Sequence, residues 1–157
     1  MKRTDNKSRC SVNFALETVG DNWSLLIVRD IVYYRKKTFG EFLASEEGIS
    51  TNILSSRLAR LERKGVLTKR PHDTDKRKET YALTERGLDL VPVLLELADW
   101  GAKHDPEAKE GRWIGLIQDD RAGAVALVKD TVRAGGSVFV GEGNVIEQLN
   151  SRAKEPT

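Results

Sequence analysis

The sequence predicts a mainly α-helical protein with one small β-hairpin, which places the fold in the α+β class. Apolar residues recur at spacings of three and four in most segments, as expected for amphipathic helices. Two short segments, residues 66–70 and 80–83, are instead rich in β-branched, aromatic or alternating residues and favour strands. The polar, turn-rich stretch between them predicts that these strands pair as a hairpin with a long tip.

Composition limits the class of protein. The chain has 157 residues, of which 39% are hydrophobic and 32% charged, as expected for a soluble globular domain with an extension. No apolar run approaches the roughly 20 residues that cross a membrane, and the charged N-terminus does not resemble a signal peptide. A single cysteine cannot form an internal disulfide, so we expect a reducing, cytoplasmic location.

Local signals define the first helices. Residues 11–19 have helical spacing, and Gly20 follows where a left-handed cap is expected. Asp21 can accept from the free amides of a second helix and so begin it. Thr38 and Glu41 form a capping box that predicts a short third helix, although a two-residue strand around Thr38 is an alternative. The second helix carries one apolar face, made of Trp23, Leu26, Ile27 and Ile31.

A fourth helix begins at Ser50 and ends at Gly65. Its core face carries Leu54, Leu58 and Leu61. Two short helices joined by a tight turn, with a polar face exposed on the second, are typical of a helix-turn-helix. Because the hairpin follows directly, the pattern predicts a winged helix-turn-helix. The polar face of the fourth helix consists of Asn52, Ser56, Arg60 and Arg63.

The rest of the chain predicts a long helix and a further helical segment. A helix capped by Thr84 should run to about His104, with a kink at Pro92 because proline removes a backbone hydrogen bond. Nine of the thirteen residues 88–100 are apolar, so this helix should be covered on more than one side, by its own domain and by a second copy. Beyond it, we expect a helix capped by Asp119 or Asp120 that runs through Arg133, a strand over 137–140 and a helix over 145–152.

Positive charge is concentrated in one block. Residues 50–78 carry nine Lys or Arg against three acids, a net charge of +6, whereas the whole chain is only +2. A basic face of this kind indicates a polyanionic partner. The alternative is a solvated face that binds nothing.

The predicted fourth helix fits double-stranded DNA as this partner. The major groove admits one α-helix, and small residues at the helix start allow a close approach to the duplex. Asn52 can pair with adenine and Arg60 with guanine, while a wing tip of Lys76, Arg77 and Lys78 can reach phosphates or the minor groove. The other candidate contacts on the fourth helix are Ser50, Thr51, Ser56, Arg57, Arg63 and Lys64.

Other chemistry finds little support. Cys10 lies at a helix start beside Lys7 and Arg9, an environment that favours the thiolate and makes a redox role conceivable; the alternative is a small residue with no chemistry. The two histidines are too isolated for a metal site. No nucleophile–base–acid set or phosphate loop is present, so we expect neither an enzyme nor a bound cofactor.

These residues resemble the HxlR-type family of bacterial winged helix-turn-helix regulators, which are relatives of the MarR type. The resemblance runs from Cys10 to about Gly101. The motifs that carry it are CSVNFALETVGDNWSLLIVRDI, TFGEF, GISTNILSSRLARLERKGVL, ETYALTERG and ADWG.

The resemblance implies a homodimer that binds a palindromic operator, with the first helix and the Pro92 helix at the dimer interface. Some members sense oxidants or electrophiles at the position of Cys10, so a redox or small-molecule effector is a further expectation. The competing hypothesis is a winged helix that binds an acidic protein. The implied interface residues are Val12, Leu16, Val91, Leu94, Leu95 and Ala98.

The predicted organisation has three parts. Residues 1–9 form a flexible arm, residues 10–105 form the DNA-binding and dimerisation domain, and residues 106–157 form an extension that the resemblance does not cover. This extension could enlarge the interface, bind a ligand or contact another protein.

Overall fold

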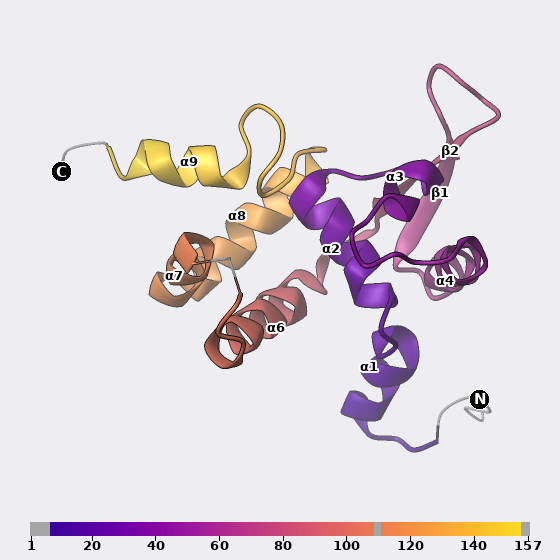
Figure 1. Ribbon diagram of the computed structural model, residues 1–157, viewed down its shortest axis with the longest axis horizontal. Helices are drawn as coiled ribbons and strands as arrows, with labels where there is room; N and C mark the ends of the chain where they lie inside the picture. Colours follow the sequence, from indigo (N-terminus) through magenta and orange to yellow (C-terminus); the bar gives the residue numbers. More distant parts are fainter. Residues whose placement is uncertain (1–6, 109–110, 155–157) are drawn as a thin grey trace.

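The computed structural model describes residues 7–108 and 111–154, and it confirms a mainly helical fold with one antiparallel β-hairpin. Most of the predicted flexible arm lies outside the described residues. The hairpin and α4 lie at one side of the molecule and α7–α9 at the other, with α2 between them (Figure 1). The elements are α1 (Ser11–Val19), α2 (Ser24–Tyr34), α3 (Phe39–Leu43), α4 (Thr51–Arg63), β1 (Leu67–Pro71), β2 (Glu79–Leu83), α5 (Glu85–Leu88), α6 (Val91–His104), α7 (Gly111–Asp119), α8 (Arg121–Arg133) and α9 (Val145–Arg152).

The junction of α1 and α2 differs from the predicted cap in one respect. Gly20 is right-handed, with φ −80°, so it does not form a left-handed cap. Its amide donates to the carbonyl of Leu16 at 2.7 Å, and a β-carbon built on Gly20 would lie 2.3 Å from the same oxygen. Close approach, rather than backbone handedness, therefore requires glycine here. Asp21 begins α2 as predicted, because its carboxylate accepts from the amides of Trp23 and Ser24.

The α3–α4 pair has the predicted helix-turn-helix form. Thr38 caps α3 by accepting from the amide of Glu41 at 3.3 Å. Thr38 also forms an isolated bridge with Thr80, so the strand alternative holds for that single residue. α3 ends at Leu43 rather than near Gly48, and the chain turns through Gly48 at φ +70°, a conformation that favours glycine.

β1 and β2 form the wing. Leu67 pairs with Leu83 at the base of the hairpin, and Pro71 pairs with Glu79 next to its tip. At the base the wing is anchored in the core by Leu67, which is buried. The tip projects away from the body of the molecule (Figure 1).

The prediction of one long helix from Thr84 to about His104 is wrong for the first third of that segment. It is divided into α5 and α6, and Pro92 stands in the first turn of α6 rather than at a kink. Proline is tolerated in the first turn of a helix because the amides there lack intrahelical partners. Thr84 caps α5, as predicted, by accepting from the amide of Gly87 at 3.1 Å.

The C-terminal helices pack on α2 and α6. Asp120 caps α8 as predicted, and α9 has its predicted bounds, whereas α7 was not predicted. The predicted strand over 137–140 is wrong. The amides of Val138 and Phe139 donate instead to the carbonyls of Val32 and Tyr33, which are free because α2 ends there.

An aromatic cluster joins these parts. Tyr33 makes edge-to-face contacts with Trp113, at 6.3 Å between ring centroids, and with Phe139, at 5.2 Å. Trp113 is 3% exposed and Ile117 is fully buried. The helices α7 and α8 therefore share one hydrophobic core with the winged helix.

Candidate nucleic-acid interface

α4 presents a small, polar surface to solvent along its N-terminal half. The Ser50 hydroxyl accepts from the amide of Ile53 at 3.2 Å and so fixes the start of the helix. Leu54, Leu58 and Leu61 are buried beneath it, as predicted, so the helix cannot rotate without exposing them. The exposed side chains of its N-terminal half are small and polar, and the full exposed set along α4 is Thr51, Asn52, Ser55, Ser56, Ala59, Glu62 and Arg63.

Two of the predicted contact residues point elsewhere. The guanidinium of Arg57 donates to the Asp21 carboxylate at 3.0 Å. Arg60 donates to the backbone carbonyl of Glu17 at the end of α1. In this structure neither guanidinium faces outward with Asn52 and Ser56. Both join α4 to the α1–α2 junction, because that junction supplies a carboxylate and free helix-end carbonyls.

A polar network holds the helix-turn-helix against α2. Arg29 pairs with Asp30 at 2.7 Å and with Glu47 in the α3–α4 turn. The hydrogen bond from Arg29 lowers the pKa of Glu47 despite some burial. Ser45 donates to the buried Asp30 carboxylate, so the α3–α4 turn is tied to α2 at two points.

The wing tip is ordered by internal hydrogen bonds. His72 Nδ1 lies 3.2 Å from the amide of Thr74 and 3.3 Å from that of Asp75, both of which donate to it. Arg77 is almost fully exposed and pairs with Asp75 at 3.1 Å, an interaction that lowers the pKa of the Asp75 carboxyl. The predicted cations Lys76 and Lys78 are exposed on either side of Arg77.

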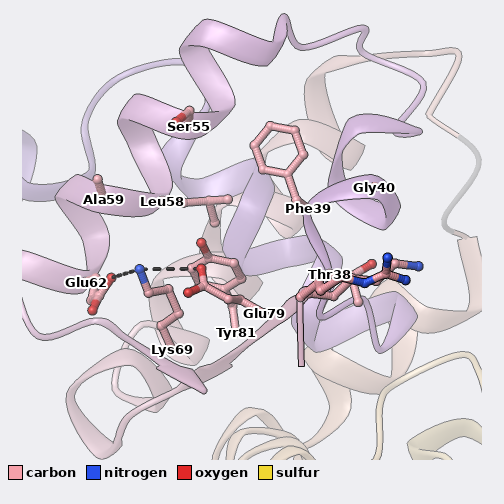
Figure 2. Close-up of a pocket in the computed structure, with 12 residues that line it drawn as sticks. Thr38, Phe39, Gly40, Ser55, Leu58, Ala59, Glu62, Lys69, Glu79 and Tyr81 are labelled. Carbon is pink, nitrogen blue, oxygen red and sulfur yellow. Dashed lines mark ion pairs between the residues drawn. The ribbon is translucent and has the colours of Figure 1, made fainter. Parts of the chain in front are cut away.

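A groove of about 610 Å³ separates α4 from the wing (Figure 2). Lys69 of β1 projects into it between two carboxylates, at 3.4 Å from Glu79 and 3.9 Å from Glu62. Both carboxylates raise the pKa of Lys69, and Glu79 has the larger effect. Phe39 from α3 and Ala59 from α4 line the opposite wall. Arg77 and Lys78 of the wing also line the groove, so its cations outnumber its two carboxylates although Lys69 is paired with both of them.

Sequence reasoning missed the groove residues. The basic block of residues 50–78 includes Lys69 but ends before Glu79, and Phe39 lies within the capping-box sequence of α3, so neither pattern brings these three residues together. In the paired strands β1 and β2, Lys69 lies directly opposite Tyr81. Helical spacing in the sequence does not predict this strand register. The alternating pattern of the hairpin was the signal that could have identified them.

The predicted redox residue is accessible. Cys10 is exposed immediately before α1, and its amide donates to the Ser8 hydroxyl at 3.2 Å. It makes no side-chain cap to α1. Lys7 and Arg9 are exposed close to it in sequence.

The apolar residues assigned to a dimer interface fall into two groups. Val12 and Leu16 on α1 are 64% and 60% exposed. On α6, however, Val91, Leu94 and Leu95 are buried in the chain's own core, and Ala98 is partly buried. Their burial leaves them unavailable to a second copy. The exposed apolar side chains of α6 are instead Val93, Leu97 and Trp100.

Within residues 7–108 and 111–154, no group of three or more His, Cys, Asp or Glu is placed to hold a metal ion. None of the helices in the described part of the chain has the length and apolar character needed to cross a membrane.

The helix-turn-helix, the polar face of α4 and the hairpin together define a winged helix-turn-helix protein. Residues 18–109 match the model of the HxlR-like helix-turn-helix family, and the chain belongs to that family. The family resemblance predicted from the sequence is thereby confirmed.

Relatives in this family are transcriptional regulators. The chain is 40% identical over 96 residues to an uncharacterized HTH-type transcriptional regulator of Mycobacterium tuberculosis, a match covering 61% of this chain and 60% of the relative. It is 30% identical over 120 residues to the regulator YybR of Bacillus subtilis, covering 74% of this chain and 92% of YybR. These proteins are regulators and not enzymes, in agreement with the sequence prediction.

Solved structures show the same fold. PA1607 matches with a TM-score of 0.58 and 34% identity, over 66% of this chain and 72% of PA1607. The reduced form of the redox regulator HypR matches with a TM-score of 0.55 and 26% identity, over 62% of this chain and 95% of HypR.

Proposed function

We propose that this protein is a homodimeric regulator of transcription in the cytoplasm that binds a palindromic operator in double-stranded DNA. The observation that carries the proposal is the exposed face of α4, which holds Asn52 and Ser56 above a buried row of leucines. A face of small polar residues suits insertion into the major groove, which is about 12 Å wide. The wing, with Lys76 and Lys78 exposed, would then lie along the phosphate backbone.

The dimer in this proposal uses the exposed apolar residues of α1 and α6. Val12 and Leu16 project from α1, which stands apart from the body of the molecule (Figure 1). Leu97 and Trp100 on α6 are 50% and 67% exposed. Covering these side chains with a second copy would remove them from water, and a twofold axis would place the two α4 helices about 34 Å apart, one turn of DNA.

DNA selection tests the proposal. Genomic fragments retained by the protein would be used in gel shifts at moderate salt, with random duplex as competitor. We expect the retained fragments to bind at least about a thousandfold more tightly than random DNA, as specific regulators do. Equal binding of both duplexes would contradict the proposal and favour the alternative, a winged helix that binds an acidic protein.

A redox signal through Cys10 is part of the proposal. The thiol is exposed, and HypR, a relative in structure, is a redox regulator. As the chain has one cysteine, a disulfide would form between two chains or with a small thiol. We expect Cys10→Ser to abolish any effect of oxidant on DNA affinity while leaving affinity under reducing conditions unchanged. An oxidant effect that persists in this variant, measured by gel shift, would remove Cys10 from the mechanism.

A further inference from the structure

A cavity of about 220 Å³ lies where the C-terminal helices meet the wing. Three parts of the chain form it: the end of α2 with the residues that follow, strand β2 with α5, and the end of α8. Its most buried lining residues are apolar, since Ile31 is 7% exposed and Leu88 only 2%. Leu83 and Val132 extend the apolar lining from β2 and α8. The volume is small and suits a compact ligand.

The rim of this cavity is strongly cationic. Arg35, Lys36, Lys37 and Arg133 line it, against one carboxylate, that of Glu85. Two of the four cations are already paired: Arg133 with Glu85 at 2.7 Å, and Lys36 with Asp30 at 3.5 Å. Within residues 7–108 and 111–154, neither of the other two cations, Arg35 and Lys37, forms an ion pair at 4.0 Å or less. Arg35 borders both this cavity and its neighbour, since a β-carbon built on Gly141 of the neighbouring cavity would lie 3.4 Å from its Nη1. An anion entering this cavity would therefore meet the unneutralised charge of Lys37 and that of Arg35, which lies between the two cavities.

The backbone at Arg35 supports a functional role for its side chain. Arg35 ends α2 with φ 58°, and it is the only residue other than glycine in the described part of the chain with a positive φ. An L-residue with a β-carbon is disfavoured in this left-handed region, where glycine or asparagine is the usual choice. Such strain tends to be retained where the side chain has work in a site.

A neighbouring cavity of about 510 Å³ is a weaker candidate. It shares Arg35 but is lined largely by glycine backbone, and its cations, Arg35 and Arg152, are matched by the carboxylates of Asp130 and Glu142. It therefore offers neither an apolar floor nor an excess of positive charge.

We propose that the 220 Å³ cavity binds a small apolar carboxylate, with the carboxylate between Arg35 and Lys37 and the apolar part against Ile31 and Leu88. The ligand would touch both the wing and α8. The amide of Tyr81 on β2 donates to the carbonyl of Lys37 at 2.7 Å, so the segment that holds the carboxylate is fixed to the wing. If the protein is the DNA-binding regulator proposed above, on which this step depends, a ligand that binds one wing orientation better than another changes the affinity for DNA.

Isothermal titration calorimetry on the full chain without DNA tests the site itself. Phenylacetate is the probe, and phenylacetamide, which has the same shape but no charge, is its matched control. At low ionic strength we expect one phenylacetate per chain with a dissociation constant on the order of 1 mM or tighter, and no measurable binding of phenylacetamide. Absence of phenylacetate binding, or equal binding of both compounds, would overturn the proposal.

Variants locate the binding. Arg35→Asn keeps a residue that tolerates the left-handed backbone, and Lys37→Gln changes an exposed side chain, so a folding defect in the first leaves the second as a test. Each is expected to weaken phenylacetate binding by about tenfold. Arg152→Gln alters only the neighbouring cavity and should leave binding unchanged. If Arg152→Gln lost phenylacetate binding while Lys37→Gln kept it, the ligand would lie in the neighbouring 510 Å³ cavity and the proposal would be refuted.

Gel shifts with retained genomic fragments separate this inference from the proposed function. Calorimetric binding with no sequence-specific DNA binding would leave the site intact and refute the regulator. Specific DNA binding without phenylacetate binding in the calorimeter would support the regulator and refute the ligand site.

Discussion

Asp21 is the residue that connects the start of α2 with α4. Its carboxylate accepts from the Ser24 hydroxyl, from the Trp23 amide and from Arg57 on α4. Burial opposes ionisation of this carboxyl, but these hydrogen bonds, together with one from the Ser24 amide, outweigh burial and lower its pKa from 3.8 to about 2. A single small side chain thus caps one helix and fixes the position of another.

The lowered pKa of Asp21 makes its contribution depend on pH. Because the folded state favours the ionised form, the stabilisation is fully present above pH 3.8, the ordinary value, and is lost as pH falls towards 2. We expect Asp21→Asn to lower the free energy of unfolding by about 1–2 kcal/mol near neutral pH. Urea titrations of the two proteins at a series of pH values measure this difference. A difference that does not shrink below about pH 4 would show that the charge of Asp21 contributes nothing.

Asn52 and Arg77 are predicted to affect DNA binding in different ways. Asn52→Ala removes a side chain on the exposed face of α4, so it should reduce the preference for operator over random DNA by about 1–3 kcal/mol. Arg77→Ala removes a wing cation and should weaken both duplexes alike, with a shallower dependence on salt. Gel shifts over a salt series measure both effects. A uniform loss in Asn52→Ala would mean that α4 does not read bases.

At the scale of elements, the sequence predicted those helices whose ends are set locally. α4, α8 and α9 begin at the side chains that cap them, because caps act within one turn, and α1 has its predicted bounds although it has no side-chain cap. Local signals failed where a distant partner decides the structure. The amides of Val138 and Phe139 pair with the end of α2, and Arg60 turns to a carbonyl of α1, relations that no spacing in the sequence contains.

The sequence predicted only part of the candidate site. The buried leucines of α4 and its polar face followed from helical periodicity, as did the exposed Asn52 and Ser56. The α4–wing groove did not, because it depends on strand register and on how the hairpin packs beside α4. The choice of interface residues on α6 failed for a related reason: this helix is apolar on two sides, and only the packing shows which side is inside.

The apolar surface of α6 leads to a prediction about assembly. Leu97→Glu places a charge on the exposed side of α6, and a twofold interface would contain that charge twice. We expect the dimer to dissociate at micromolar concentration, so that the measured mass falls from twice 17.6 kDa to that value. Light scattering during size-exclusion chromatography measures the mass.

The matched control for Leu97 is another exposed apolar residue. Val140 is 45% exposed but lies on the segment between α8 and α9, away from α1 and α6. Val140→Glu should keep the dimer mass. The interface assignment would fail if Val140→Glu dissociated the dimer while Leu97→Glu did not.

At the scale of the whole molecule, the C-terminal helices share one hydrophobic core with α4. Charged pairs join them to the earlier part of the chain at several points, including Lys129 with Asp89 at 2.9 Å and Arg133 with Glu85 at 2.7 Å. Exposed pairs of this kind contribute little stability individually. The buried contacts of Trp113 and Ile117 with the shared core contribute more, because they remove large apolar side chains from water.

A shared core predicts one cooperative unfolding transition for residues on both sides of it. Ile117 is fully buried in α7, and Ile117→Ala should lower the free energy of unfolding of the whole chain by about 2–5 kcal/mol. Val140→Ala, at an exposed position, should change it by less than about 0.5 kcal/mol. Denaturant titrations followed by circular dichroism and by tryptophan fluorescence measure these changes, with Trp23 in the winged helix and Trp113 in α7 as reporters. If Ile117→Ala shifted only part of the transition, and the signal from Trp23 in a Trp100→Phe, Trp113→Phe background did not move, α7–α9 would be a separate folding unit. A ligand held between α8 and the wing would then have no rigid connection through which to act on α4.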